Sequence, residues 1–432
     1  MLRFVELLRS DRVMLWRGAA ALLLLTLTPV VARAADVNGD AAQPSEPMAL
    51  PSADAVAAAL SNTAPSEPDS PFYKLDWSLA LRGAYINDSN TGTHYEALTL
   101  PSVSLTHTGS DESFHATADG QVSKTDGGGI NIDQARLSAG SALQFTEDSS
   151  LTSNASLSMT QEDVNSPDVA SDVAATPVET SGTIDSTFKQ QFGRFNVSLS
   201  GNAGRDIYGP TTLRDGTLED ETSQNNTQIG GGLRLGFQLT PIVEAFTTAN
   251  ATRTLFDQPS STLGTSLNGN LYTVMAGATA KWDETLSASV SAGVGLQHFD
   301  DPSLADVVAT LYDANLTYKP SRTLTLNGDL KTTIGAPGPN GSGTAQIGYS
   351  ATADATYLVN DWLDWRGSAG WHNTSYAGST STDRGYTLGL GADYLLNTHA
   401  KVSADYNFEH SEVTPSPPED THTVTLGMTF QK

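Results

Sequence analysis

Oppositely charged side chains recur two residues apart in the second half of this chain. Asp329 is followed by Lys331, and Asp364 is followed by Arg366, with one residue between the members of each pair. In an extended strand, residues two apart point to the same side, so each pair would share one face. Such groups can form ion pairs between strands, or they can line a water-filled passage and select ions by charge. The two roles are compatible.

We extend this set to other charged residues on the polar face of neighbouring segments, as candidates that line a lumen. The set comprises Asp313, Asp329, Lys331, Asp354, Asp364, Arg366, Asp393, Lys401 and Asp405. We expect Asp354 to lie opposite Arg366 across the turn at 357–362. If the lumen follows the formal net charge of −25, it prefers cations.

No sequence motif indicates catalysis or a bound cofactor. The chain has no cysteine, which excludes disulfides, thiolate metal sites and a catalytic thiol. The histidines show no metal-ligand spacing. GGGLRLG (230–236) lies inside an alternating segment and opens no helix, so we expect it to ease curvature or leave space in the lumen. We expect no enzyme activity, no cofactor, no metal and, given the acidic charge, no nucleic acid.

From Trp77 onward, apolar and polar residues alternate with a period of two, which indicates strands with one apolar face. The clearest case is TLSASVSAGVGLQHF (285–299). Short turns and long polar connections also alternate along the chain. This pattern predicts an all-β fold of about 18 antiparallel strands in up-and-down order, with 16 also possible. The first strand is expected at 74–86 and the last at 421–430.

Such strands also suit a soluble sandwich, a solenoid or a propeller, but a transmembrane barrel fits three observations better. The polar face is too charged to be buried without partners in a soluble core. Aromatic residues fall on the apolar face near strand ends, as in the pair Tyr386 and Tyr394. Their spacing corresponds to roughly 20 Å along a tilted strand, close to the apolar band of outer-membrane barrels. Short turns on one side and longer loops on the other are also typical of these barrels.

The N-terminus has the pattern of a secretory signal peptide. Several arginines precede the apolar run GAAALLLLTLTPVV (18–31), and a small-x-small site at Ala32-Arg33-Ala34 predicts cleavage near Ala34/Ala35. The domains expected are therefore a signal peptide at 1–34, a disordered periplasmic leader rich in Pro and Ala at 35–72, and a barrel at 73–432. The expected location is the outer membrane of a Gram-negative cell.

Two segments carry a resemblance to a known family. FDDPSLADVVATLYDANLTYKPSRTLTLNGDL (299–330) and ADYLLN (392–397) resemble the beta-barrel porin type 2 family of bacterial outer-membrane proteins. The resemblance extends over residues 75–432. It implies an outer-membrane barrel, in some members linked to exopolysaccharide synthesis, and it brings no catalytic motif.

The chain ends with HTVTLGMTFQK (422–432), a strict alternation of apolar and polar residues. This ending resembles the C-terminal signal that the outer-membrane assembly machinery recognises. Thr425, Gly427 and Phe430 fit that signal, whereas Lys432 stands where it has an aromatic residue. A terminal lysine can still reach the lipid headgroups. We therefore expect the outer-membrane bilayer and the assembly machinery as partners.

The sequence favours a porin-like channel for passive diffusion of small hydrophilic solutes, with a mild preference for cations. We expect a charge-lined constriction, narrowed by an inward-folded loop such as 160–180. A first alternative is an accessory barrel for exopolysaccharide export or cell-surface assembly, with a periplasmic or export partner. A second is a structural or adhesive surface barrel.

Overall fold

The computed structural model describes residues 73–432, apart from residues 91, 127–129, 163, 165–168, 170–171, 338–342 and 415. The predicted signal peptide and leader lie outside the described residues. Across the described ranges, no helix has the length and apolar character that crossing a membrane requires.

The described residues form strands joined by turns and loops, with one short 3-10 helix. The elements are β1 (Lys74–Asp88), β2 (Gly92–Thr108), β3 (Glu112–Thr125), β4 (Ile130–Thr146), β5 (Ser149–Gln161), β6 (Val173–Ala175), β7 (Val178–Phe192), β8 (Phe195–Tyr208), β9 (Thr211–Leu213), β10 (Leu218–Glu219), η2 (Thr222–Gln224), β11 (Asn226–Thr240), β12 (Val243–Phe256), β13 (Gly269–Trp282), β14 (Leu286–Phe299), β15 (Val307–Tyr318), β16 (Leu324–Gly335), β17 (Gln346–Asn360), β18 (Leu363–Tyr376), β19 (Thr382–Asn397), β20 (Ala400–Val413) and β21 (Glu419–Gln431).

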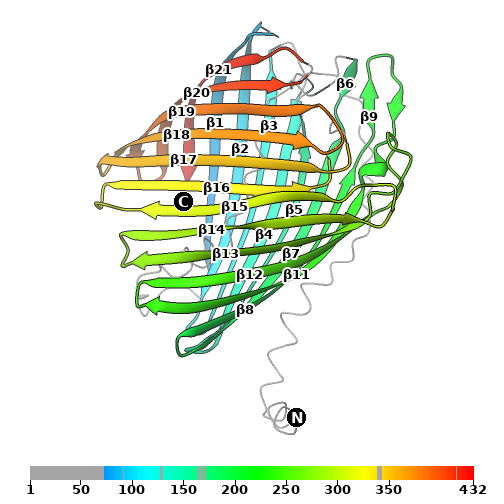
Figure 1. Ribbon diagram of the computed structural model, residues 1–432. Helices are drawn as coiled ribbons and strands as arrows, with labels where there is room; N and C mark the ends of the chain where they lie inside the picture. The colour runs from blue at the N-terminus through cyan, green and yellow to red at the C-terminus, as the bar shows by residue number, and fades with distance from the viewer. Residues whose placement is uncertain are drawn as a thin grey trace. The chain divides into compact units, whose positions relative to one another are not determined.

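Eighteen of these strands form one closed antiparallel barrel, which confirms the predicted fold class and the larger of the two strand counts. Each strand pairs with the next along the chain, as in an up-and-down barrel (Figure 1). The last strand closes the ring, because β21 pairs with β1 from Ser78 with Gln431 to Asp88 with Thr421. Closure pairs the first strand with the last, so the sheet has no outermost strand with a wholly free edge, which is the arrangement that a bilayer requires.

The two ends of the barrel differ in the length of their connections. Short turns such as 193–194, 241–242 and 398–399 join the strands at one end, which we call the turn end. The other end, the loop end, carries the longer connections, including 209–225 and 257–268. Chain direction places the start of β1 and the end of β21 at the turn end.

The three remaining strands form a small sheet in the loops and were not predicted. β9 pairs with β10 inside the connection between β8 and β11, and also with β6 from the connection between β5 and β7. The described part of loop 160–180 therefore contacts the neighbouring loop. The end of the hairpin formed by β16 and β17 turns into the barrel interior.

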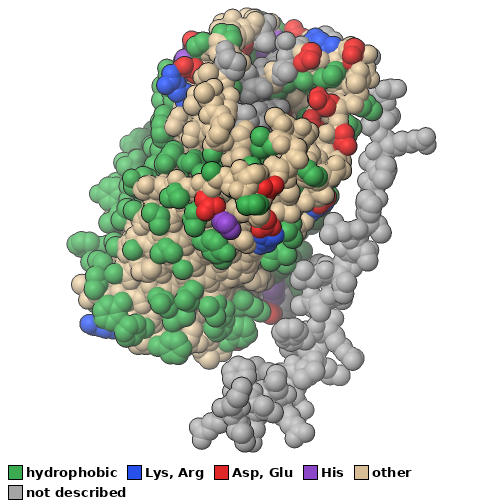
Figure 2. Space-filling model, turned by 45° about the vertical axis from the view of Figure 1, so that its right-hand side comes forward, with side chains coloured by type: hydrophobic (Ala, Val, Ile, Leu, Met, Phe, Trp, Pro, Cys, Tyr) green, Lys and Arg blue, Asp and Glu red, His purple; other side chains and the backbone are tan. Residues whose placement is uncertain are grey.

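Alternation along each strand separates an apolar outer face from a polar inner face. On β21, Val424, Leu426, Met428 and Phe430 are all more than a third exposed on the outside, as predicted. Aromatic residues lie on the same face near strand ends, among them Trp77, Trp282, Trp365, Tyr386 and Tyr394. Figure 2 shows hydrophobic side chains spread over the strands and acidic side chains gathered toward the loop end. This distribution matches a lipid-facing wall.

Candidate functional site

All nine of the predicted lumen-lining residues lie on the inner face of the barrel wall. Each one alternates with exposed outward-facing neighbours, as Asp313 does with Tyr312 and Asp364 does with Trp365. They come from consecutive strands, β15 to β20, so they form one continuous charged strip across the wall. Their role in conduction remains a prediction.

Four of the nine form an ion-pair network across three strands. The Arg366 guanidinium on β18 lies 2.6 Å from an Asp405 carboxylate oxygen on β20 and 3.2 Å from Asp393 on β19. Lys401 on β20 contacts the other Asp393 oxygen at 3.2 Å. The Asp393 side chain is only 9% exposed, so it depends on these two cations to offset its loss of hydration.

Gly391 makes the network possible because it lies between Arg366 and Asp405. Register places Gly391 of β19 directly between Arg366 and Asp405, so the arginine side chain must cross it. A Cβ atom at residue 391 would lie 2.3 Å from an Asp405 carboxylate oxygen and 3.0 Å from an Arg366 guanidinium nitrogen. Any larger residue would push the two ends of the ion pair apart.

The other predicted residues lie near this network without joining it. Asp364 is directly opposite Asp393. The expectation that Asp354 faces Arg366 is wrong, because Asp354 is paired in register with Ser368. β17 and β18 run on to Asn360 and Leu363 and leave a two-residue turn, which moves the register away from the predicted one.

On the next part of the wall, Asp313 and Lys331 are directly opposite each other on β15 and β16. The adjacent pair in the ladder is Asn315 with Asp329, and the asparagine amide donates to the Asp329 carboxylate at 3.4 Å. Asp313, Asp329 and Lys331 are exposed on the lumen side, as is Asp354 of β17, so a passing ion can reach them.

Sequence reasoning missed a second ion pair on the inner face, in the glycine-rich strand β11. Arg234 contacts Glu244 of β12 at 2.6 Å, and its guanidinium carbon lies 4.1 Å from the centre of the Phe246 ring. A Cβ atom at residue 236 would lie 2.5 Å from a Glu244 carboxylate oxygen, so Gly236 leaves space for this pair. Arg234, a charged residue inside GGGLRLG, is the feature of the sequence that could have indicated this ion pair.

The end of β16 leaves the wall and lies inside the barrel. β15 and β16 pair only between Asp313–Lys331 and Tyr318–Leu326, although both strands extend further toward the loop end. Beyond this point Ile334 packs on the inner face of β14. A Cβ atom built on Gly295 there would lie 2.6 Å from the Cδ1 atom of Ile334.

The first residues of β17 follow the same course. Ala345 is 1% exposed and packs with Leu267, in the connection before β13, and with Phe299, the last residue of β14. The Ala377 amide donates to the Ala345 carbonyl oxygen at 2.8 Å, so β17 and β18 stay bonded to each other at this end. We call residues 332–337 and 343–346 the hairpin end.

A small cavity separates the hairpin end from the inner wall. Its lining is amphipathic and includes Gln228, Thr252, Thr254, Leu271, Gln297 and Ile334. Among the described residues, the hairpin end occupies part of the barrel interior near the loop end. The inward fold predicted for loop 160–180 stays a prediction, because residues 163, 165–168 and 170–171 lie outside the described residues.

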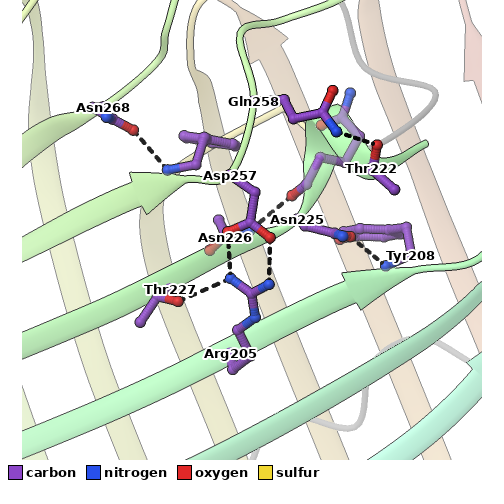
Figure 3. Close-up of polar contacts among 11 residues, drawn as sticks. Arg205, Tyr208, Thr222, Asn225, Asn226, Thr227, Asp257, Gln258 and Asn268 are labelled. Atoms are coloured by element: carbon purple, nitrogen blue, oxygen red, sulfur yellow. Dashed lines mark hydrogen bonds and ion pairs between the residues drawn. The ribbon is translucent and has the colours of Figure 1, made fainter. Parts of the chain in front are cut away.

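A second group of ion pairs lies on the outer face, at the loop end. The Arg205 guanidinium donates to both Asp257 carboxylate oxygens, at 2.7 and 2.5 Å, and to the Thr227 hydroxyl at 3.0 Å (Figure 3). Arg253 contacts Asp300 in the same bidentate way. These bonds join the long loops to neighbouring strand ends.

Hydrogen bonds also lower the pKa values of three aspartates in these loops. The hydrogen bond from Arg205 holds the pKa of Asp257 below its usual value, and Arg253 lowers the pKa of Asp300 in the same way. Hydrogen bonds from Thr265 and Ser303 lower the pKa of Asp301. The carboxylates therefore remain charged, and keep their bonds, well below neutral pH.

A closed antiparallel barrel with an apolar, aromatic-rimmed outer face and a charged inner face defines a porin-like β-barrel membrane protein. The family model described as "Putative beta-barrel porin 2" matches residues 86–432. The chain belongs to this family, as its sequence suggested, and it is an outer-membrane β-barrel. Among curated proteins, none matches it.

Three solved structures are similar to this chain over most of its length, at low identity. OpdK of Pseudomonas aeruginosa, crystallised with vanillate, is 11% identical with a TM-score of 0.43, over 83% of this chain and 99% of OpdK. OccK3 (OpdO) of the same organism is 12% identical with a TM-score of 0.40, over 83% of this chain and 96% of its own. The copper transporter OprC is 9% identical with a TM-score of 0.45, over 85% and 82%.

Proposed function

We propose that this protein is a channel for the passive diffusion of small hydrophilic solutes across the outer membrane, with a preference for cations. The observation that carries the proposal is the charge of the inner face. Acidic side chains outnumber basic ones there along the described strands. The acidic residues on this face include Asp76, Asp119, Asp185, Asp206, Asp313, Asp329, Asp354, Asp364, Asp383, Asp393, Asp405 and Glu409; the basic ones include Arg82, Arg136, Lys189, Arg234, Lys331, Arg366 and Lys401.

This charge excess acts directly on ions in the lumen. Carboxylates on the wall of a narrow aqueous passage raise the local concentration of cations and lower that of anions. Several of the acids are already paired, as Asp393 and Asp405 are with Arg366, so they contribute little net field. Asp329 and Asp354 have no basic partner within the described residues and are exposed to the lumen. They are therefore the groups that set the selectivity.

The test is a reversal-potential measurement in planar bilayers with a potassium chloride gradient. We expect the wild-type protein to select potassium over chloride. The double variant Asp329→Asn with Asp354→Asn should move the reversal potential toward zero. The matched control, Asp148→Asn with Asp361→Asn, removes the same charge from exposed turns outside the lumen and should leave the potential close to wild type.

Two outcomes contradict the proposal. Absence of channels in correctly folded protein refutes the diffusion function, and anion selectivity refutes the assigned preference. An equal effect of the two double variants would show that net charge, and not the wall residues, determines selectivity. Substrate-free conductance is a sufficient readout because the proposed passage is water-filled.

A further inference from the structure

β15 has an unpaired edge in an otherwise closed wall. It stays paired with β14 along the whole of Val307–Tyr318, but its ladder with β16 stops at Asp313. The Lys319 amide donates to Thr285 on the β14 side, so alternation directs the amides of Val308, Thr310 and Tyr312 toward β16. Of these, Tyr312 donates to the Thr332 hydroxyl at 3.0 Å; Val308 and Thr310 have no partner among the described residues.

Such an edge is unfavourable at the level of the lipid. Outward-facing Val308 is 67% exposed and Tyr312 is 45% exposed, so this part of β15 faces the surroundings of the barrel. Backbone amide and carbonyl groups without partners do not persist against hydrocarbon, which offers no hydrogen bonds. The edge therefore favours a strand that can complete the ladder.

The chain itself supplies that strand. If the register of β15 and β16 continued past Asp313 and Lys331, Thr332 would face Tyr312 and Ile334 would face Thr310. Alternation along β16 assigns Ile334 to the outer, apolar face, together with its partner Ile347 on β17. In the structure Ile334 instead lies inside, against Gly295 and Leu311. The alternation along β16 therefore predicts Ile334 in the lipid-facing wall, whereas the structure places it in the barrel interior.

The observed position also has a built receptor. Gly295 lacks the Cβ atom that would collide with Ile334, and Leu311 is 5% exposed beneath it. Docking on β15 would expose this apolar receptor to water but would complete the backbone ladder. In the lumen position the edge of β15 lacks a ladder partner, and in the wall position the apolar receptor is exposed to water. The two packings of this segment therefore compete.

We propose that the unpaired edge of β15, Val307–Tyr312, is a docking site for residues 332–335 of β16, and that exchange between this site and the lumen regulates passage through the barrel. Docking takes Ile334 out of the lumen and into the lipid-facing wall. Its consequence for passage rests on the proposed channel function, whereas the docking itself does not.

The absence of cysteine allows each arrangement to be trapped by an engineered disulfide. Gly295→Cys with Ile334→Cys reports the lumen position, and Thr310→Cys with Ile334→Cys reports the wall position. The matched control is Ala314→Cys with Leu330→Cys, directly opposed residues of the formed ladder that also face outward. Direct opposition places Cα atoms within the range that a disulfide spans. Leu311→Cys with Ile334→Cys is a second lumen pair if the Gly295 variant folds poorly.

The experiment is mild oxidation of each variant in outer-membrane vesicles, followed by non-reducing gels and by conductance in bilayers. We expect the control, a lumen pair and the wall pair all to cross-link. The cross-linked wall pair should conduct at least about twofold more than the cross-linked lumen pair, and reductant should abolish the difference.

Cross-linking of the control without any cross-linking of the wall pair would overturn the docking proposal. Equal conductance of the two trapped states would overturn the regulatory role while leaving docking intact. Cross-linking as expected in a protein that forms no channels would refute the proposed function alone, because the gel readout does not require conduction.

Discussion

Replacing Arg366 with glutamine should destabilise the barrel through the ion-pair network on its inner face. The substitution removes the contacts to Asp405 at 2.6 Å and to Asp393 at 3.2 Å. A hydrogen bond to a charged group is worth about 1.5–3 kcal/mol when well shielded. The Arg366 side chain is 40% exposed, and Asp393 keeps Lys401, so the two contacts must be discounted toward surface values. We expect a loss of about 2 kcal/mol in the free energy of unfolding.

The assay is urea unfolding of the protein in lipid vesicles, followed by heat-modifiable gel mobility. Arg384→Gln is the control, because Arg384 also contacts a carboxylate, Glu412, but lies 58% exposed on the outer face. We expect it to cost less than about 1 kcal/mol. Adding Asp405→Asn to Arg366→Gln should recover part of the loss, because it removes the carboxylate left without its cation.

Equal costs for Arg366→Gln and Arg384→Gln would refute the reasoning, because burial of Asp393 would then contribute nothing. The double variant tests the same reasoning. If its loss of unfolding free energy equals or exceeds the sum of the losses in the two single variants, Arg366 and Asp405 share no stabilising interaction, and the reasoning is wrong.

Two further predictions concern the ends of the strands. Deleting Phe430, Gln431 and Lys432 should abolish assembly into the outer membrane, whereas Lys432→Phe should not, as measured by the heat-modifiable fraction in membrane extracts; normal assembly of the truncated chain would contradict this. The lowered pKa of Asp257 means that its bond to Arg205 stabilises the loops above the ordinary carboxyl pKa and is lost as pH falls through the lowered one. Limited proteolysis should therefore cut loop 257–268 faster at pH values below about 4, and Arg205→Gln should be cut fast already at neutral pH; a pH-independent rate in the wild type would count against the bond.

Most of the wall could be predicted from the sequence because one local rule governs it. A strand between lipid and water must alternate, so β1 and β21 were located within a few residues at 74–86 and 421–430. The ion pairs were harder, because they depend on register. The length of a two-residue turn after Asn360 decided that Asp354 faces Ser368. Arg366 reaches Asp405 only because Gly391, on the strand between them, has no side chain.

The hairpin end could not be predicted, because it departs from the rule that located the strands. Alternation assigns Ile334 to the lipid face. Its inward position depends on Gly295, a residue of another strand that shows nothing unusual in its own alternating segment. The small loop sheet of β6, β9 and β10 was missed for a related reason, since strands of two or three residues carry no recognisable period.

Closure of the ring by its first and last strands has a consequence for biogenesis. β1 pairs with its neighbour β2 on one edge, but its other edge has no partner until β21, far along the chain, is in place. The Lys432 amide donates to the Trp77 carbonyl oxygen at 3.1 Å, so even the terminal residue belongs to this joint. Every intermediate in which β21 has not paired with β1 therefore carries an open sheet edge, and such edges associate with other chains. A chain of this protein must therefore be kept apart from its copies until β21 pairs with β1.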